Sequence, residues 1–130
     1  MTVEEYLRTT VEAVMPAFKG NIHDANGMSF GEFLNEKSAE TPSVFISYEG
    51  FTDVEYRSDG MSDVDTENYS LYIRCNDSVK QYVKLLRDRI KEDGSEFTDD
   101  NGVDRYIQII GGQPFRDNGA DAFEITIQIK

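Results

Sequence analysis

The 130-residue sequence has one cysteine, one histidine, three prolines and no tryptophan. A single cysteine cannot form an internal disulfide, which fits a reducing compartment without requiring one. No run approaches the ~18 apolar residues of a transmembrane helix, and residues 1–5 include neither a basic region nor an apolar run of signal-peptide length. We therefore expect a protein that folds in the cytoplasm and makes no membrane contact.

Signatures of nucleotide and metal sites are also missing: there is no zinc-type Cys/His cluster, no Walker loop and no G-x-G-x-x-G run. A Cys–His nucleophile would need His23, in a predicted loop, beside Cys75, which falls in the inward register of a predicted strand. A buried cysteine usually behaves as a small hydrophobic residue. These patterns therefore predict no catalytic residue, cofactor or metal ligand.

Positive charge is scarce, since 13 Lys and Arg oppose 25 Asp and Glu and give a net charge of −12. Such a charge repels phosphate backbones, so specific nucleic-acid binding is not expected. The length predicts one domain over residues 1–130. Apolar residues make up only 38%, but seven tyrosines and eight phenylalanines supply bulk for a core.

The clearest pattern is a strand followed directly by a helix in residues 69–90. Residues 69–76 alternate between apolar and polar, which predicts a strand with one face inward. Either Asp77 or Ser78 can cap the helix that follows. Its apolar residues recur at i, i+4, i+7 and i+11, as on one stripe of a helix: Val79, Val83, Leu86 and Ile90.

The other elements surround this unit. A capping box of Thr2 and Glu5 begins a helix that Pro16 ends or kinks, so it runs from about residue 3 to 15 or 18. Strands are predicted over 44–48, ended by Gly50, over 105–110 and over 122–129, with a further strand in 51–57 after a turn. Ser29 caps a short helical turn, and residues 19–29, 58–67 and 92–102 are predicted connections. This order predicts an α+β fold: a mostly antiparallel sheet of four or five strands with two main helices packed on one face.

An acidic tract occupies residues 49–67, where seven Asp and Glu oppose only Arg57, a local net charge of −6. Asp63 and Asp65 are two residues apart, but the D-x-[DN]-x-[DN]-G order of an EF-hand is missing. The tract is therefore interpreted as a solvated loop or the rim of an interface rather than a metal site.

The predicted helix over 79–90 has the opposite charge. Residues 80–91 contain five basic groups and only Asp88 as an acid, a net charge of +4. Three interpretations are open: a solvated face, a surface that meets the acidic tract of another copy, or a nucleic-acid contact, which the whole-chain charge disfavours. We expect a subunit interface formed by Lys80, Lys84, Arg87 and Lys91 against Asp59, Asp63 and Asp65.

A loop predicted over residues 111–121 holds Gln113, Phe115 and Arg116 between glycines. Phe115 either folds back on the core or docks onto a partner, because long hairpin loops often carry binding residues. Gly111-Gly112 suits a bulge, and Asn118-Gly119 is a strong hairpin-turn signal. We expect Gln113, Phe115 and Arg116 to form a docking loop.

The order of parts then resembles a known family. A Pro-Ser-Val-Phe-Ile-Ser-Tyr-Glu-Gly strand (42–50) follows the first helix; a Tyr-Ser-Leu-Tyr-Ile-Arg strand (69–74), a helix and a closing Glu-Ile-Thr-Ile-Gln-Ile strand (124–129) come later. This layout is similar to the Mu-type phage Gp37 family of tail proteins and, more broadly, to phage tail-terminator proteins. The motifs are short, and neither residues 19–41 nor the acidic tract map onto the family.

The resemblance implies a structural phage or prophage protein without catalysis. Members of the family cap the head-proximal end of the tail tube as a ring, so the implied partners are other copies, tail-tube proteins and neck proteins. The implied location is the bacterial cytoplasm and then the virion tail. An acidic lumen would let DNA slide through without sticking. Two alternatives stay open: a small monomeric acidic module that binds a basic protein, and a metal-dependent enzyme that uses the acidic tract.

Overall fold

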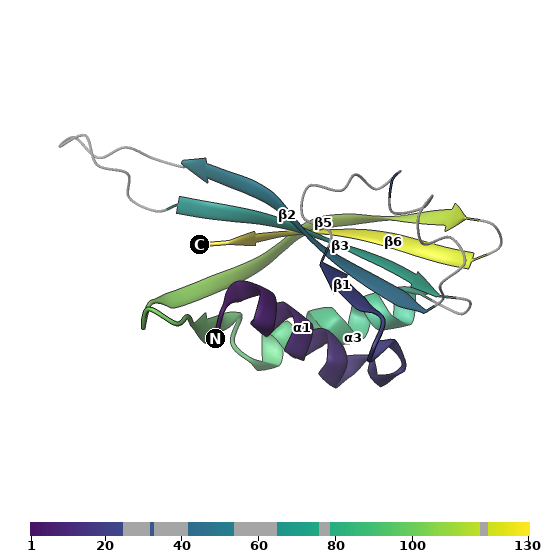
Figure 1. The fold of residues 1–130 in the computed structure, drawn as a ribbon, viewed down its shortest axis with the longest axis horizontal. Coiled ribbons are helices and arrows are strands. Elements are labelled where there is room, and N and C mark those ends of the chain that lie inside the picture. Colours follow the sequence, from purple (N-terminus) through teal and green to yellow (C-terminus); the bar gives the residue numbers. More distant parts are fainter. Residues whose placement is uncertain (25–31, 33–41, 54–64, 76–78, 118–119) are drawn as a thin grey trace.

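The computed structural model describes residues 1–24, 32, 42–53, 65–75, 79–117 and 120–130. In this structure two helices cover one side of a twisted sheet (Figure 1). The elements in chain order are α1 (Val3–Val14), the 3₁₀ turn η1 (Pro16–Phe18), β1 (Ile22–Asp24), β2 (Ser43–Asp53), β3 (Asp65–Cys75), α3 (Val79–Glu92), β4 (Glu96–Thr98), β5 (Asp104–Asp117) and β6 (Ala120–Ile129). Both α1 and α3 lie against the same face of the sheet (Figure 1).

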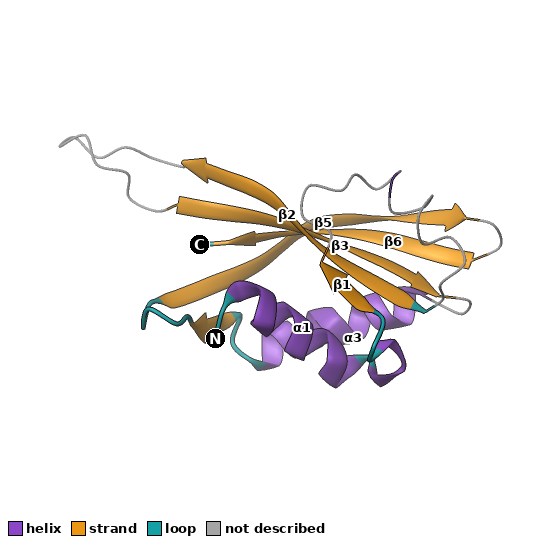
Figure 2. Cartoon of the chain, viewed as in Figure 1, coloured by secondary structure: helices purple, strands orange, loops and turns teal. Residues whose placement is uncertain are grey.

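The sheet has six strands in the order β1-β2-β3-β6-β5-β4; strands are orange in Figure 2. The α+β class with two main helices is confirmed, and the sheet is mostly antiparallel as expected, but the expected number of four or five strands is too low. Strand β1 runs parallel to β2, and the other pairings are antiparallel. The two additional strands, β1 and β4, have three residues each and fall in segments predicted as connections. Three residues are too few to show a two-residue period.

Helix α1 begins and ends where its local signals predict. The Thr2 hydroxyl accepts a hydrogen bond from the Glu5 amide at 3.1 Å, and the Thr2 amide donates to the Glu5 carboxylate at 3.2 Å. The helix ends at Val14 because Pro16 cannot donate to the preceding turn. Arg8 on α1 then donates to the Ile22 carbonyl at 2.8 Å, which holds β1 beside the helix.

The strand–helix unit forms the middle of the core, as predicted. In β3, the residues with the inward period are buried against the helices, and in α3 Val79, Leu86 and Ile90 are buried. Leu86 is fully buried, whereas its neighbour Leu85 is 40% exposed. The core on this face combines α1, α3 and the inward residues of β2, β3 and β6.

Strand β2 does not end at Gly50. Gly50 has a φ of +93°, a conformation that glycine adopts without strain, and the register with β3 shifts between Tyr48 and Phe51. The chain therefore passes through a bulge and continues as the same strand to Asp53. The predicted turn at Gly50 is wrong, because one extra residue is accommodated as a bulge within a continuous strand. Residues 54–57 of the predicted second strand lie outside the described residues.

Most of the predicted loop over 111–121 is also part of a continuous strand. Strand β5 continues through Gly111 and Gly112 to Asp117, with a register shift between Ile109 and Gly111, and β6 begins at Ala120. The bulge falls between Ile109 and Gly111, and both glycines are paired with β6, so the segment predicted as a docking loop is instead the outer half of a long hairpin.

The sheet face opposite the helices is not uniformly solvated. Phe45 of β2 and Tyr72 and Arg74 of β3 lie on this face and are only 2%, 3% and 2% exposed. Tyr72 donates from its hydroxyl to Glu49 at 3.3 Å, and burial raises its pKa to about 12. Both faces of the sheet are therefore buried at this end.

Two tyrosines on the helix-covered face donate hydrogen bonds to carboxylates from other elements. Tyr6 of α1 donates to Asp93 at 3.0 Å, and Tyr69 of β3 donates to Glu4 at 3.0 Å. Burial, and then the bond to Asp93, raises the pKa of Tyr6 to about 12. Burial and the neighbouring Glu4 also raise the pKa of Tyr69 above its ordinary value.

These contacts predict an alkaline limit to stability. Because the folded protein favours the neutral phenols, their contribution is complete below the ordinary tyrosine pKa of ~10 and is lost as the pH rises further. For Tyr6 the loss falls between pH ~10 and its raised pKa of about 12. We expect the melting temperature of the double variant Tyr6→Phe/Tyr69→Phe to fall less steeply over this interval than that of the wild type.

The matched control is Tyr106→Phe, since Tyr106 is 55% exposed. Thermal melts followed by circular dichroism at closely spaced pH values would measure the slope. An equal slope in the wild type and the double variant would contradict the assignment of the alkaline loss to these two contacts.

Candidate interaction site: a basic groove beside α3

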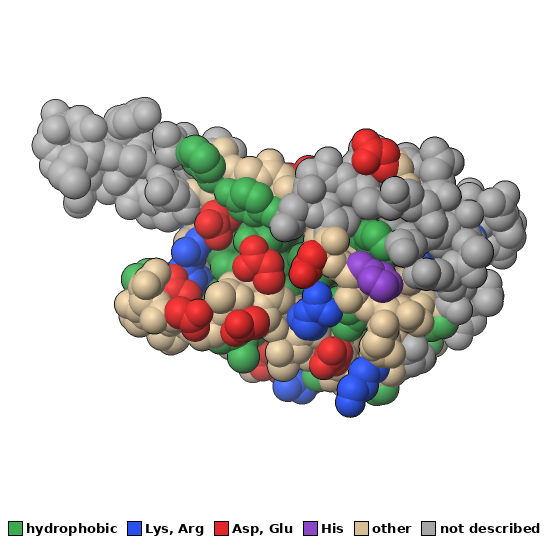
Figure 3. All heavy atoms as spheres, in the orientation of Figure 1, with side chains coloured by type: hydrophobic (Ala, Val, Ile, Leu, Met, Phe, Trp, Pro, Cys, Tyr) green, Lys and Arg blue, Asp and Glu red, His purple; other side chains and the backbone are tan. Residues whose placement is uncertain are grey.

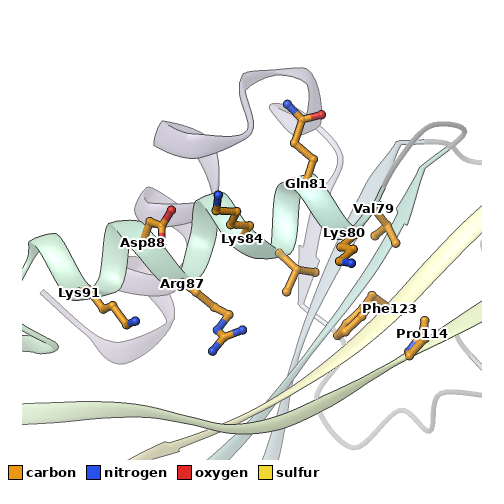
Figure 4. Close-up of a pocket in the computed structure, with 10 residues that line it drawn as sticks. Val79, Lys80, Gln81, Lys84, Arg87, Asp88, Lys91, Pro114 and Phe123 are labelled. Carbon is orange, nitrogen blue, oxygen red and sulfur yellow. The ribbon is translucent and has the colours of Figure 1, made fainter.

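A groove of about 910 Å³ runs between α3 and the strands β5 and β6. Its polar wall carries four basic side chains together with Gln81 and one acid, Asp88, and its floor is apolar. We call it the basic groove and define it by Lys80, Gln81, Lys84, Arg87, Asp88, Lys91, Val79, Val83, Pro114 and Phe123. Figure 4 shows the basic residues along α3, with Phe123 and Pro114 on the strands below the helix.

The helical period explains why the four basic residues lie together. Lys80, Lys84, Arg87 and Lys91 follow each member of the apolar stripe of α3 by one residue, so they keep its spacing and form the adjacent stripe. Burial of Leu86 and Ile90 fixes the rotation of the helix on the sheet. That rotation leaves the basic stripe exposed above the outer strands, and Arg87 extends toward them (Figure 4).

Glycines in the β5 bulge shape the floor. At Gly112 an added Cβ would lie 2.6 Å from the Phe123 ring and 2.8 Å from the Glu124 carbonyl oxygen, so the ring occupies the space that a side chain would fill. A second hollow of about 280 Å³ continues along the bulge and shares Val83, Arg87 and Phe123 with the first. The Phe123 ring can therefore lie in the floor only because Gly112 has no side chain.

No ion pair within the described part of the chain involves the four basic residues of the groove. Other basic residues are paired: Arg105 lies 3.2 Å from Glu67 and 3.5 Å from Asp99, and Arg8 lies 3.1 Å from Asp24. On the face shown in Figure 3, acidic side chains are spread over the described surface. The basic groove is thus a concentration of positive charge on a protein of net charge −12.

The structure places the other predicted interface residues in different ways. Asp59 and Asp63 lie outside the described residues, as does the helical turn predicted at Ser29, and only the backbone of Asp65, at the start of β3, is described. Gln113 is exposed and donates to Glu124 at 3.4 Å. Phe115 and Arg116 are paired in register with Ala122 and Asp121 of β6, so their backbone belongs to the hairpin.

No protein-family model matches the chain, and no curated protein does. The resemblance to tail-terminator proteins therefore stays a prediction, and a function has to be argued from the surface itself.

The described residues do not assemble the nucleophilic site considered above. His23 pairs in register with Phe45, which pairs with Tyr72, whereas Cys75 is three positions beyond Tyr72 on β3 and therefore on the opposite face. The His23 ring packs 4.8 Å from the Phe45 ring, and Cys75 is buried in the core. A Cys–His pair is excluded by this geometry.

Two further findings concern metal and membrane sites. Within the ranges described above, no group of three or more His, Cys, Asp and Glu side chains is arranged to hold a metal ion. A search of the same residues finds no helix with the length and apolar character needed to cross a bilayer.

The basic wall of the groove is predicted by the sequence pattern, but its apolar floor is not. Phe123 lies on the predicted strand over 122–129, but nothing in the pattern indicates that α3 leaves its ring partly uncovered. Pro114 comes from the segment predicted as a loop. The signal that pointed to the floor was the Gly111-Gly112 pair, since adjacent glycines in a strand often mark close approach of another group.

Proposed function

We propose that this chain is a structural protein of the tail-terminator type, which acts by assembling with other copies at the end of a tail tube and catalyses no reaction. The observation that carries the proposal is the segregation of charge: an exposed basic groove on a strongly acidic protein. A surface with one basic face and an acidic remainder favours head-to-tail contacts between identical copies.

Head-to-tail contacts close into a ring when the rotation between copies permits. The groove supports this role because it combines exposed charge with an apolar floor at Phe123 and Pro114, and apolar area is what stabilises a contact once charge has oriented it. Tail-tube and neck proteins are the partners that the same proposal assigns to the faces of the ring.

The test is the absolute mass of the purified protein, measured by light scattering over a concentration series, with negative-stain imaging of the most concentrated sample. We expect a mass that rises above the monomer's 14.8 kDa and annular particles in the images. In ~1 M salt, where charges are screened within ~3 Å, the mass should return toward the monomer.

A mass of 14.8 kDa at every concentration, without annular particles, would contradict assembly of the chain by itself. It would favour the second candidate, a monomeric acidic module that binds a basic protein, for which the net charge of −12 is the supporting observation.

A further inference from the structure

The basic groove favours an occupant that carries both acidic and apolar side chains. Its wall offers four cations, which favour a segment with several carboxylates. Its floor of Val83, Pro114 and Phe123 favours an apolar side chain between those carboxylates. A purely acidic surface would leave the floor uncovered, and a purely apolar one would leave the cations without partners.

We infer that the groove receives residues 58–65 of a second copy of this chain, with Val64 or Met61 against the apolar floor and the flanking aspartates against the basic wall. This inference rests on the proposed self-assembly and specifies its contact. The sequence of the segment, Ser-Asp-Gly-Met-Ser-Asp-Val-Asp, combines acids with these two apolar residues and contains no basic residue.

A segment of the same copy cannot reach the floor. Phe123 pairs in register with Ile73, about eight residue steps along β3 from Asp65, which is ~26 Å at ~3.3 Å per residue. The chain leaves the sheet at Asp53 and returns at its partner Asp65, twelve residue steps later. The residue midway is six steps from each anchor, so it reaches at most ~22 Å from them at ~3.6 Å per step. Val64, one step from Asp65, reaches under ~4 Å from it. The occupant must therefore come from another molecule.

Each copy then carries both halves of the contact at separate places: the groove beside Phe123 and the acidic segment beyond Asp53 and Asp65. A contact between two different surfaces is heterologous, so one copy can bind two neighbours at once. This arrangement makes a specific prediction about two variants that are each defective in only one half.

The groove variant is Lys84→Glu/Arg87→Glu, and the segment variant is Asp59→Ser/Asp63→Ser/Val64→Ser. Both groove positions are exposed on α3, so the fold should be retained, which circular dichroism would check. We expect each variant alone to stay at the monomer mass of 14.8 kDa under conditions in which the wild type assembles.

Mixed in equal amounts, the two variants should form a one-to-one dimer of about twice 14.8 kDa that grows no further, because only one intact contact exists. Light scattering coupled to size-exclusion chromatography would detect it. We expect the mixture to associate at least ~10-fold more tightly than either variant alone, a difference of ~1.4 kcal/mol.

The matched control is Lys19→Glu/Lys130→Glu, which changes the net charge by the same amount at exposed positions outside the groove and should assemble as the wild type does. Assembly of the groove variant at wild-type strength would overturn the inference while leaving the proposed function intact. A groove variant that fails alone and is not rescued by the segment variant would overturn the assignment of residues 58–65 as the occupant. A wild type that never assembles would instead remove the proposed function and the inference together.

Discussion

Replacing Gly112 with alanine is expected to destabilise the protein by about 1–3 kcal/mol, the usual cost of forcing extra atoms into a packed site. The new Cβ would lie 2.6 Å from the Phe123 ring and 2.8 Å from the Glu124 carbonyl oxygen. The ring could turn aside, but the carbonyl belongs to β6, which pairs with β5 at this position, so the backbone would have to separate. The substitution should also displace the groove's aromatic floor and thus weaken assembly.

Its neighbour provides the control. A Cβ added at Gly111 meets nothing within 4 Å, and neither glycine has a positive φ, so Gly111→Ala should change stability by less than ~0.5 kcal/mol. Urea unfolding followed by circular dichroism would measure both free energies. Equal values for the two variants would show that the ring and carbonyl do not crowd Gly112.

Replacing Leu86 with alanine is expected to cost about 2–5 kcal/mol, the range for truncating a fully buried leucine. Leu86 is 0% exposed and lies in the cluster where α3 meets the sheet, so the lost atoms would leave a cavity. Because Leu86 fixes the rotation of α3, its loss should also leave the four basic side chains less firmly positioned over the groove.

Leu85→Ala is the natural comparison, since Leu85 is 40% exposed on the same helix and alanine has the higher helix propensity. Its stability should stay within ~0.5 kcal/mol of the wild type. For a chain of this length each kcal/mol corresponds to about 3–5 °C in melting temperature, so thermal melts would separate the two variants. A similar loss for both would mean that α3 packs with a different face inward.

Elements with a long, regular period were predictable from sequence. Helix α1 has a capping box and a proline stop, and α3, β3 and β6 each show an unbroken apolar pattern. Strands β1 and β4 were missed because their short lengths carry no period, and they form only through partners already in place, such as Arg8 for β1. The lengths of β2 and β5 were predicted too short, because each strand contains a bulge near a glycine, Gly50 or Gly111. In a sequence, glycine is equally consistent with a turn and with a bulge.

The candidate site was half predictable for a related reason. A helical period places the four basic residues on one stripe, which is local information. The apolar floor depends on how far α3 extends over β5 and β6, and that distance is set by packing between segments about 30 residues apart. Sequence alone therefore gave a charged face, and only the fold turned it into a groove.

The position of β6 has a consequence for the order in which the protein can fold. Although β6 follows the other strands in the chain, it lies between β3 and β5, so among the described strands the backbone pairing between β1-β2-β3 and β5-β4 runs through β6. During synthesis, the inner edges of β3 and β5 remain unpaired until residues 120–129 emerge from the ribosome. Until then the nascent chain presents two open strand edges, the kind of surface on which chaperones and aggregation compete.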